Sequence, residues 1–267
     1  MRENKRVHQI IVTITLLYLF IPLAATFLYS LSTTWNKTIL PEGLTLKWFS
    51  ELFQDPRFID ALMRTIQLTV GTMVVSILIM VPAIFAITVY APRFEKWLQT
   101  IVLFPYAMPG VVAAVGLLSI YSKSGLSMVL VLGGSYFVLI LPFMYQGVRN
   151  SLRTVNAKTL VEAAELLGAS RSTAFWKVIV PNITPGIIVS SLLSFSVLFG
   201  EFVLANILVG GNFETIQIYL YRRLRESGHL SSAIVVSYFL LLLVLSWIMV
   251  SLSRRGTLKL KKKEPTV

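Results

Sequence analysis

Six long apolar stretches without a charged residue restrict the fold of this chain more than any other feature. They cover residues 9–36, 65–92, 97–122, 124–148, 178–200 and 230–253. Each is 23 to 28 residues long, whereas a helix needs only about 20 residues to cross hydrocarbon ~30 Å thick. The composition, with 55% apolar and 13% charged residues, is also atypical of soluble domains. We therefore expect an all-α, polytopic membrane protein with six transmembrane helices, forming a single domain over residues 1–267.

The basic residues are distributed unequally between the two sides of such a protein. Sixteen of the 24 lie in segments on the same side as the N-terminus, and eight lie in the other segments. Because lysine and arginine accumulate on the cytoplasmic side, residues 1–8, 149–181 and 254–267 are predicted to be cytoplasmic. This bias explains the net charge of +12 without a nucleic-acid partner, and the basic C-terminal tail is expected to contact anionic lipid.

The first apolar stretch follows a short basic segment, as in a secretory signal peptide. It is too long for one and lacks a clean cleavage site, so we interpret it as an uncleaved first helix. The sequence contains no cysteine, and its two histidines, His8 and His229, flank apolar stretches, as is typical of interfacial polar residues. No phosphate-binding Gly-x4-Gly-Lys-Ser/Thr motif or His-Glu-x2-His motif occurs. We expect no catalytic residue, no metal site and no cofactor on this chain.

Prolines interrupt several of the apolar stretches. Two of them, Pro105 and Pro109, fall together with Gly110 in one short segment, 104–110. Such a cluster should break a helix inside the membrane. Two explanations remain open at this point: the break lines a cavity, or neighbouring helices simply satisfy the freed backbone groups.

The connection 149–181, between the fourth and fifth helices, is too long for a turn and too polar for lipid. Its pattern predicts a helix-turn-helix. The first helix carries an apolar stripe of Val155, Leu160, Ala163, Ala164 and Leu167. Gly168 suits the left-handed position after a helix end, Ser170 suits the cap of a second helix, and Pro181 is predicted to stop that helix.

The same connection contains Glu162-Ala163-Ala164, three residues, Gly168, nine residues and Val178-Ile179-Val180-Pro181. This spacing resembles the EAA loop of permeases from binding-protein-dependent ATP-binding-cassette importers, in which the last four positions read Ile-x-Leu-Pro. The valines at 178 and 180 are conservative departures. A surface amphipathic helix lying in the headgroups is the alternative reading, but the glutamates and the glycine bend have no role there.

The resemblance implies what the chain does and which residues take part. Glu162, Ala163, Ala164, Gly168 and Pro181 would form a cytoplasmic coupling loop that docks on a separate ATPase. The chain itself would not be an enzyme, since ATP and Mg²⁺ would bind to that partner. The expected assembly contains a homologous permease subunit, two ATP-binding subunits and an extracytoplasmic binding protein, in the bacterial inner membrane with both termini cytoplasmic.

The fifth apolar stretch is followed directly by a carboxylate, Glu201. If the fifth helix starts near Pro185, Glu201 lies about 24 Å along it, in the outer third. An ionisable group at that depth is a candidate for the substrate pathway; an interfacial glutamate in contact with water is the alternative. Asn206 is a weaker candidate. The outer arginines 222, 223 and 225 run against the charge bias, and they could face an acidic binding protein or form ion pairs with Glu214 or Glu226.

The substrate is predicted with less support than the class of transporter. The short six-helix chain is most similar to the spermidine and putrescine permease group, and a cationic polyamine would suit Glu201. The segment 199–202 is also similar to permeases for phosphonate, iron(III) or an oxyanion. From another class, a secondary transporter or channel is the chief competitor, although such proteins seldom need this helix-turn-helix and usually hold more charges within the membrane.

Overall fold

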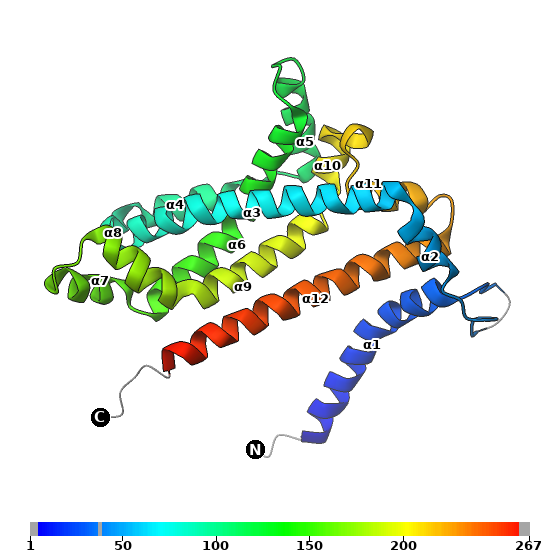
Figure 1. The fold of residues 1–267 in the computed structure, drawn as a ribbon, viewed down its shortest axis with the longest axis horizontal. Helices are drawn as coiled ribbons and strands as arrows, with labels where there is room; N and C mark the ends of the chain where they lie inside the picture. Colours follow the sequence, from blue (N-terminus) through cyan, green and yellow to red (C-terminus); the bar gives the residue numbers. More distant parts are fainter. Residues whose placement is uncertain (1–4, 37–38, 262–267) are drawn as a thin grey trace. The chain divides into compact units, whose positions relative to one another are not determined.

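The computed structural model describes residues 5–36 and 39–261, which are almost entirely helical (Figure 1). The longer helices are α1 (Lys5–Leu31), α3 (Pro56–Tyr90), α6 (Met128–Thr154), α9 (Val180–Phe199) and α12 (Gly228–Lys261). Shorter helices are α2 (Lys47–Gln54), α4 (Glu95–Leu103), α5 (Gly110–Tyr121), α7 (Ala157–Leu166), α8 (Arg171–Ala174), α10 (Val203–Leu208) and α11 (Ile216–Arg223). An isolated antiparallel bridge pairs Ser32 with Leu44.

Within the described residues, five helices are long and apolar enough to cross a membrane. A sixth candidate is the pair Pro92–Ala107 and Gly110–Tyr121, which is bent by 93°. The bend falls at residues 108–109, directly after the short 3₁₀ turn Phe104–Ala107, within the segment where the sequence predicts a break. The predicted all-α polytopic fold is therefore confirmed, with the third span broken.

Several helix ends differ from the ends of the apolar stretches. α3 begins at Pro56, nine residues before its charge-free stretch, because proline suits the first helical turn. The carboxylate of Asp55 supports this start, since its Oδ1 accepts a hydrogen bond from the backbone N of Arg57 at 2.9 Å. α1 ends at Leu31 rather than continuing to residue 36. Hydropathy alone does not locate these ends.

The chain divides into two compact units, one of residues 1–60 and 219–242, the other of residues 61–218 and 243–267. In the first unit the ring of His229 is stacked between Tyr29 and Trp48, with ring centroids 4.1 and 5.2 Å away. Its Nδ1 lies 3.1 Å from Ser32 Oγ. This residue, predicted as a simple interfacial one, thus helps to order the segment after α1. The other predicted interfacial histidine, His8, lies on α1 and is exposed.

The second unit is built around α6 and α9, which lie side by side (Figure 1). The two helices approach closely because small residues face each other at their crossing. A Cβ added to Gly147 would lie 2.9 Å from Ser190 Oγ, and one added to Gly186 would overlap the side chain of Ser151. Contacts this short exclude a larger side chain at either glycine.

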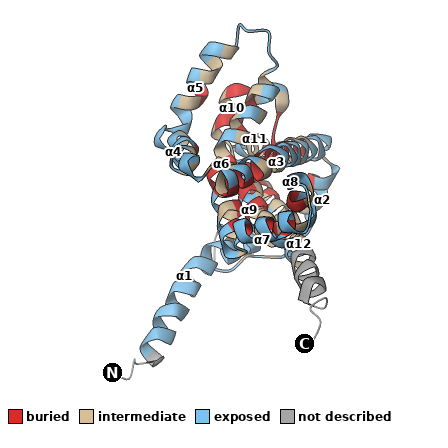
Figure 2. Ribbon diagram, turned by 90° about the vertical axis from the view of Figure 1, so that its left-hand side faces the viewer, coloured by how far each residue is buried: buried red, intermediate tan, exposed pale blue. Residues whose placement is uncertain are grey.

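By contrast, α1, in the first unit, leaves almost all of its apolar surface exposed. The most apolar part of this helix is entirely unburied, and Figure 2 shows it in the colour of exposed residues along its length. Such a surface is stable only when lipid or another apolar surface covers it. This exposure agrees with a membrane-spanning helix.

Candidate functional site

The predicted turn of the coupling segment is formed by Gly168. This residue has a φ of +83°, which only glycine adopts at little cost. The backbone N of Gly168 donates to Glu165 O at 2.9 Å and that of Ala169 donates to Ala164 O at 3.0 Å. These two bonds are the Schellman arrangement that ends a helix. The left-handed position predicted for Gly168 is confirmed.

The second helix of the segment begins as predicted at Ser170. Its Oγ accepts a hydrogen bond from the backbone N of Thr173 at 3.2 Å, which caps α8. The first helix, α7, is preceded by Asn156, which has a φ of +50°. Sequence reasoning missed this second left-handed residue, although asparagine is one of the few residue types that tolerate the conformation. It separates α7 from α6.

The predicted helix stop at Pro181 is wrong. The helix continues through this proline, so that Arg171–Phe199 forms one 29-residue span. Residues Phe175–Ile179 adopt a π-helical turn, in which the backbone N of Val180 donates to Phe175 O. A proline has no N–H to donate and its ring crowds the carbonyl four residues earlier. The wider turn just before Pro181 relieves this conflict, so α8, the π-helical turn and α9 follow one another without a break.

The apolar stripe predicted on the first helix is only partly correct. The residues of α7 that are buried are Ala157, Val161 and Ala164. Ala163 and Leu167 are exposed, whereas Leu160 and Val155 pack partly against the core. The buried residues follow one another at i, i+4 and i+7, so the buried face of α7 runs through Ala157, Val161 and Ala164 rather than through Ala163 and Leu167.

The surface that remains exposed on this segment combines charge and apolar residues. Glu162 is 59% exposed, with its Oε1 3.9 Å from Lys158 Nζ, and Ala163 lies beside it. Leu166 and Leu167 at the tip are both 89% exposed, although they lie between two spans rather than within one. Two adjacent leucines outside the spans form a surface that another protein could cover.

Glu201 lies just beyond α9 rather than within it, because the helix ends at Phe199. Its two carboxylate oxygens accept hydrogen bonds from the backbone N of Leu204 at 2.7 Å and of Ala205 at 3.1 Å. Oε2 also accepts from the Tyr136 hydroxyl at 3.1 Å. The carboxylate thus satisfies the free N–H groups at the start of α10 and ties that helix to α6.

Asn206 lies on α10 with its side chain exposed, whereas Glu201 is half-buried. None of the hydrogen bonds that the structure gives for Glu201 involves the Asn206 side chain, so the two residues do not form one site. Sequence reasoning missed Tyr136, the partner of Glu201, because 65 residues separate the two in the chain. The local signal that was available is the position of Glu201, directly after the helix-ending Gly200 and just before a short apolar helix.

A cavity of about 550 Å³ lies next to α10. Its wall includes Pro105, Tyr106 and Met108 from the break in the third span, residues of α5 and α6, and Leu204. The Tyr106 hydroxyl donates to the Leu139 carbonyl at 2.9 Å and so fixes the broken segment to α6. Of the two explanations for the proline cluster, the structure supports the cavity. Leu204 is part of the cavity wall, and its backbone N donates a hydrogen bond to the carboxylate of Glu201, which therefore lies next to this wall.

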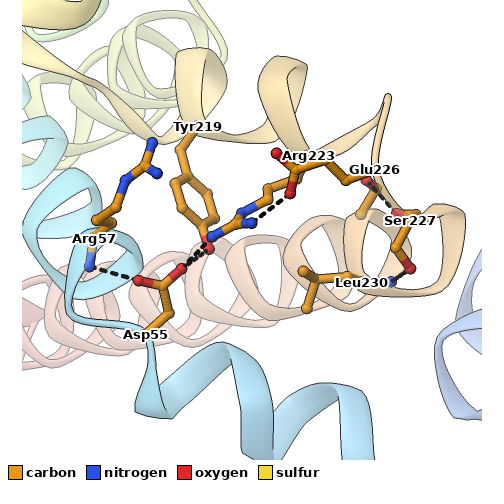
Figure 3. A network of polar contacts seen from close by, with 8 residues as sticks. Asp55, Arg57, Tyr219, Arg223, Glu226, Ser227 and Leu230 are labelled. Carbon is orange, nitrogen blue, oxygen red and sulfur yellow. Dashed lines mark hydrogen bonds and ion pairs between the residues drawn. The ribbon is translucent and has the colours of Figure 1, made fainter.

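The arginines near α11 are partly paired within the first unit (Figure 3). Arg223 Nη2 lies 2.6 Å from Asp55 Oδ2, and its other nitrogen Nη1 bonds Glu226. Tyr219 donates to the same Asp55 oxygen at 2.7 Å. The ion pair with Glu226 was one of the two predicted alternatives; Asp55 was not foreseen, since it lies 168 residues away. Among the described residues, no group of three or more metal-binding side chains gathers anywhere.

Comparison with known proteins defines the class of this protein. The family model described as "Binding-protein-dependent transport system inner membrane component" matches residues 79–257. The chain therefore belongs to this family: it is a multi-pass permease subunit of a bacterial ABC importer in the inner membrane. The matched range contains both the coupling segment and Glu201.

Individual relatives come from more than one transport system. The putative 2-aminoethylphosphonate permease PhnV of Salmonella paratyphi A is 30% identical over 189 residues, 70% of each chain. The spermidine/putrescine permease PotC of Escherichia coli K12 is 28% identical over 240 residues, 89% of this chain and 88% of the relative. The solved structure of a bacterial alginate importer gives a TM-score of 0.69 at 18% identity, covering 92% of this chain and 95% of its own. It supports the fold.

Proposed function

We propose that this chain forms one half of the translocation pathway and that segment 149–181 couples it to a separate ATPase. The observation that carries the proposal is the exposed tip of this segment, Leu166 and Leu167, beside the exposed Glu162. Burying a leucine side chain in a contact contributes about 1.5–3 kcal/mol to its free energy. A charged residue at the edge of the contact adds specificity and fixes its orientation. A second, homologous permease subunit would complete the pathway.

The connection between this tip and the rest of the molecule supports a mechanical role. The tip is joined through Gly168 and Ser170 to the continuous helix Arg171–Phe199. A helix of this length is stiff compared with a loop, so a displacement of the tip reaches Gly200 and the Glu201 cap at the opposite end. ATP and Mg²⁺ would act on the ATPase partner, and their effect would enter this chain through the tip.

The proposed orientation places the tip and both termini in the cytoplasm. The distribution of basic residues supports this orientation. On the opposite side, an extracytoplasmic binding protein would deliver the substrate. The alginate importer provides a parallel, since one solved structure of it is in complex with a periplasmic protein bound to an alginate pentasaccharide.

For the substrate we propose a polyamine of the spermidine and putrescine type, with 2-aminoethylphosphonate as the second candidate. The polyamine permease matches more of both chains, whereas the aminophosphonate permease has the higher identity over a shorter region. Both candidates carry an ammonium group at neutral pH. The carboxylate of Glu201 bonds the backbone N of Leu204, a residue of the cavity wall, and its negative charge would favour a cationic group on the substrate even though its hydrogen bonds are internal.

Reconstitution tests the coupling role. In proteoliposomes that contain the full importer, Gly168→Val and Glu162→Ala should each reduce ATP-dependent uptake about tenfold or more. A β-branched residue resists the left-handed φ of Gly168, and Glu162→Ala removes a charge at the tip. Gly125→Val is the matched control, because Gly125 has a similar φ of +75° in a turn far along the chain from the segment. Equal uptake by Gly168→Val and Gly125→Val would contradict the assignment.

Uptake of labelled compounds tests the substrate. Wild-type importer with its binding protein should accumulate spermidine or putrescine, and excess unlabelled 2-aminoethylphosphonate should not compete. Competition by the aminophosphonate together with no polyamine uptake would favour the second candidate. Uptake of neither would leave the permease class in place and remove both substrates.

A further inference from the structure

The part of the third span that precedes its break is held to α6 by polar contacts at both ends. At the first residue of α4, the Glu95 carboxylate accepts hydrogen bonds from Arg149 Nε and, at 3.1 and 3.3 Å, from Arg153 Nη2. At the break, the Tyr106 hydroxyl donates to the Leu139 carbonyl at 2.9 Å. Arg149, Arg153 and Leu139 all belong to α6. The two contacts therefore join the same two parts of the chain, one at each end of α4.

Between these contacts, α4 is attached by few apolar residues. Leu98 and Val102 are the residues of α4 that join the apolar core, whereas Trp97 and Ile101 are 70% and 62% exposed. Leu98 and Val102 follow Glu95 at i+3 and i+7, which is the spacing of one helix face. Lipid tails are as apolar as leucine side chains, so apolar contacts alone give helices little drive to associate in a membrane. The polar contacts therefore fix the position of α4 along α6.

The ion pair at Glu95 is partly shielded from water. The side chains of Glu95 and Arg149 are 18% and 20% exposed, and that of Arg153 is 54% exposed. Reduced contact with water strengthens the attraction between opposite charges, and charge-assisted bonds to two guanidinium groups restrict the orientation of the carboxylate. Glu95 is the acceptor that both arginines share, so its loss would release both of them.

Glu95 also lies beside the beginning of the coupling segment. Arg149 and Arg153 belong to segment 149–181 as well as to α6. Leu152 and Ala157, on either side of the turn between α6 and α7, are 1% and 3% exposed. Both of them line, together with Glu95, a hollow of about 270 Å³. Because this turn is packed rather than free, a displacement of α7 reaches the end of α6 to which Glu95 is bound.

We propose that Glu95 is a positioning residue that carries displacements of the coupling segment to the break in the third span. The inference rests on the proposed function, since it assumes that an ATPase moves this segment. α4, fixed to α6 at both ends, follows α6 when the segment moves. The movement is then taken up at Met108 and Pro109, which lie outside any helix. Because Pro105, Tyr106 and Met108 line the cavity next to α10, the cavity wall responds to the ATPase by a second route besides the helix Arg171–Phe199.

Hydrogen–deuterium exchange tests the proposal without knowledge of the substrate. The full importer is placed in nanodiscs, and exchange of the backbone amides in residues 104–110 is measured by mass spectrometry, without nucleotide and with ATP and vanadate. In the wild type, we expect the nucleotide to change the exchange rate of these residues. Glu95→Gln keeps the size of the side chain but removes its charge, and the change should become about threefold smaller or more.

Further variants separate a positioning role from a loss of stability. Glu95→Asp keeps the carboxylate and should keep most of the nucleotide-dependent change. Glu95→Gln/Tyr106→Phe releases α4 at both ends and should abolish the change. Glu51→Gln is the matched control, because Glu51 forms an i,i+4 ion pair with Lys47 at 3.5 Å in the other compact unit, and it should behave as the wild type.

The results distinguish this inference from the proposed function. An equal change in Glu95→Gln and the wild type would overturn the inference, and so would no change in a wild-type importer that copurifies with its ATPase. Failure of the wild type to copurify would instead contradict the proposed function. If Glu95→Gln does not assemble, Arg153→Gln replaces it, because Arg153 is the more exposed partner and the bond to Arg149 is kept. A smaller nucleotide-dependent change in Arg153→Gln would then support the inference, and an unaltered one would overturn it.

Discussion

The two ends of the helix Arg171–Phe199 differ in what they expose and what they bury. At the Arg171 end, two leucines are almost fully exposed and Glu162 is solvated. At the Phe199 end, Glu201 is half-buried and its carboxylate is taken up by two backbone N–H groups and a tyrosine. An exposed apolar residue needs a partner outside the chain, whereas a bonded carboxylate already has its partners inside. The first end therefore points to an interface, and the second end to a junction that holds α10 in place.

The largest effect is expected from breaking the link between the two ends. A Cβ at Gly186 would overlap Ser151 Oγ and lie 2.7 Å from Ser151 Cβ, so Gly186→Ala should destabilise the protein by about 1–3 kcal/mol through overpacking. Thermal unfolding in detergent measures this. Gly71→Ala on α3 is the control, because nothing lies within 4 Å of its added Cβ. The double variant Gly186→Ala/Ser151→Gly should recover most of the loss, and failure to recover would place the strain elsewhere.

The next effect concerns the exposed end alone. Leu166→Glu/Leu167→Glu should weaken copurification with the ATPase subunit about tenfold, or ~1.4 kcal/mol, because apolar contacts are lost and only part of the ~1.5–3 kcal/mol from burying each leucine appears as affinity. Both residues are 89% exposed, so the stability of the isolated chain should not change. Leu130→Glu is not a suitable control because Leu130 lines the cavity; Leu40→Glu, 69% exposed near α2, is a better one. Equal copurification of all variants would show that the tip is not an interface.

A smaller effect separates charge from structure at the Glu201 end. Glu201→Gln removes the charge and one backbone acceptor, while Tyr136→Phe removes one hydrogen bond and leaves the charge. Each should cost about 1 kcal/mol of stability. If the charge serves a cationic substrate, polyamine uptake should fall several-fold more in Glu201→Gln than in Tyr136→Phe. Equal uptake by the two variants at matched protein amounts would leave Glu201 with its structural role only.

The smallest effect is expected at the cap of α8. Ser170→Ala removes the acceptor for the Thr173 N–H and should cost about 1 kcal/mol or less, as other caps do. Ser170→Asp should keep the cap and the wild-type unfolding temperature. A loss of ATP-dependent uptake in Ser170→Ala much larger than its loss of stability would give this residue a part in coupling that its geometry does not suggest.

The sequence predicted those features that depend on one residue or one local pattern. Charge-free stretches identified the spans because hydrocarbon excludes charge, and Gly168 was correctly placed because its conformation is a local property. Pro181 was misjudged because a wider turn upstream removes the conflict that normally ends a helix. The bond of Tyr136 to Glu201 and the pairing of Asp55 with Arg223 were not foreseen, since each joins residues far apart in the chain. The assignment of Glu162, Ala163, Ala164, Gly168 and Pro181 to coupling, and of Glu201 and Asn206 to the pathway, stays a prediction.

The close crossing of α6 and α9 has a mechanical consequence. Gly186 lies 15 residues from Arg171 and 13 residues from Phe199, or about 22 and 20 Å at the usual helical rise. The crossing thus divides the span into two arms of nearly equal length. Because α6 and α9 lie in contact and Tyr136 of α6 also bonds Glu201, we expect a displacement imposed at the leucine tip to move the two helices together rather than one past the other.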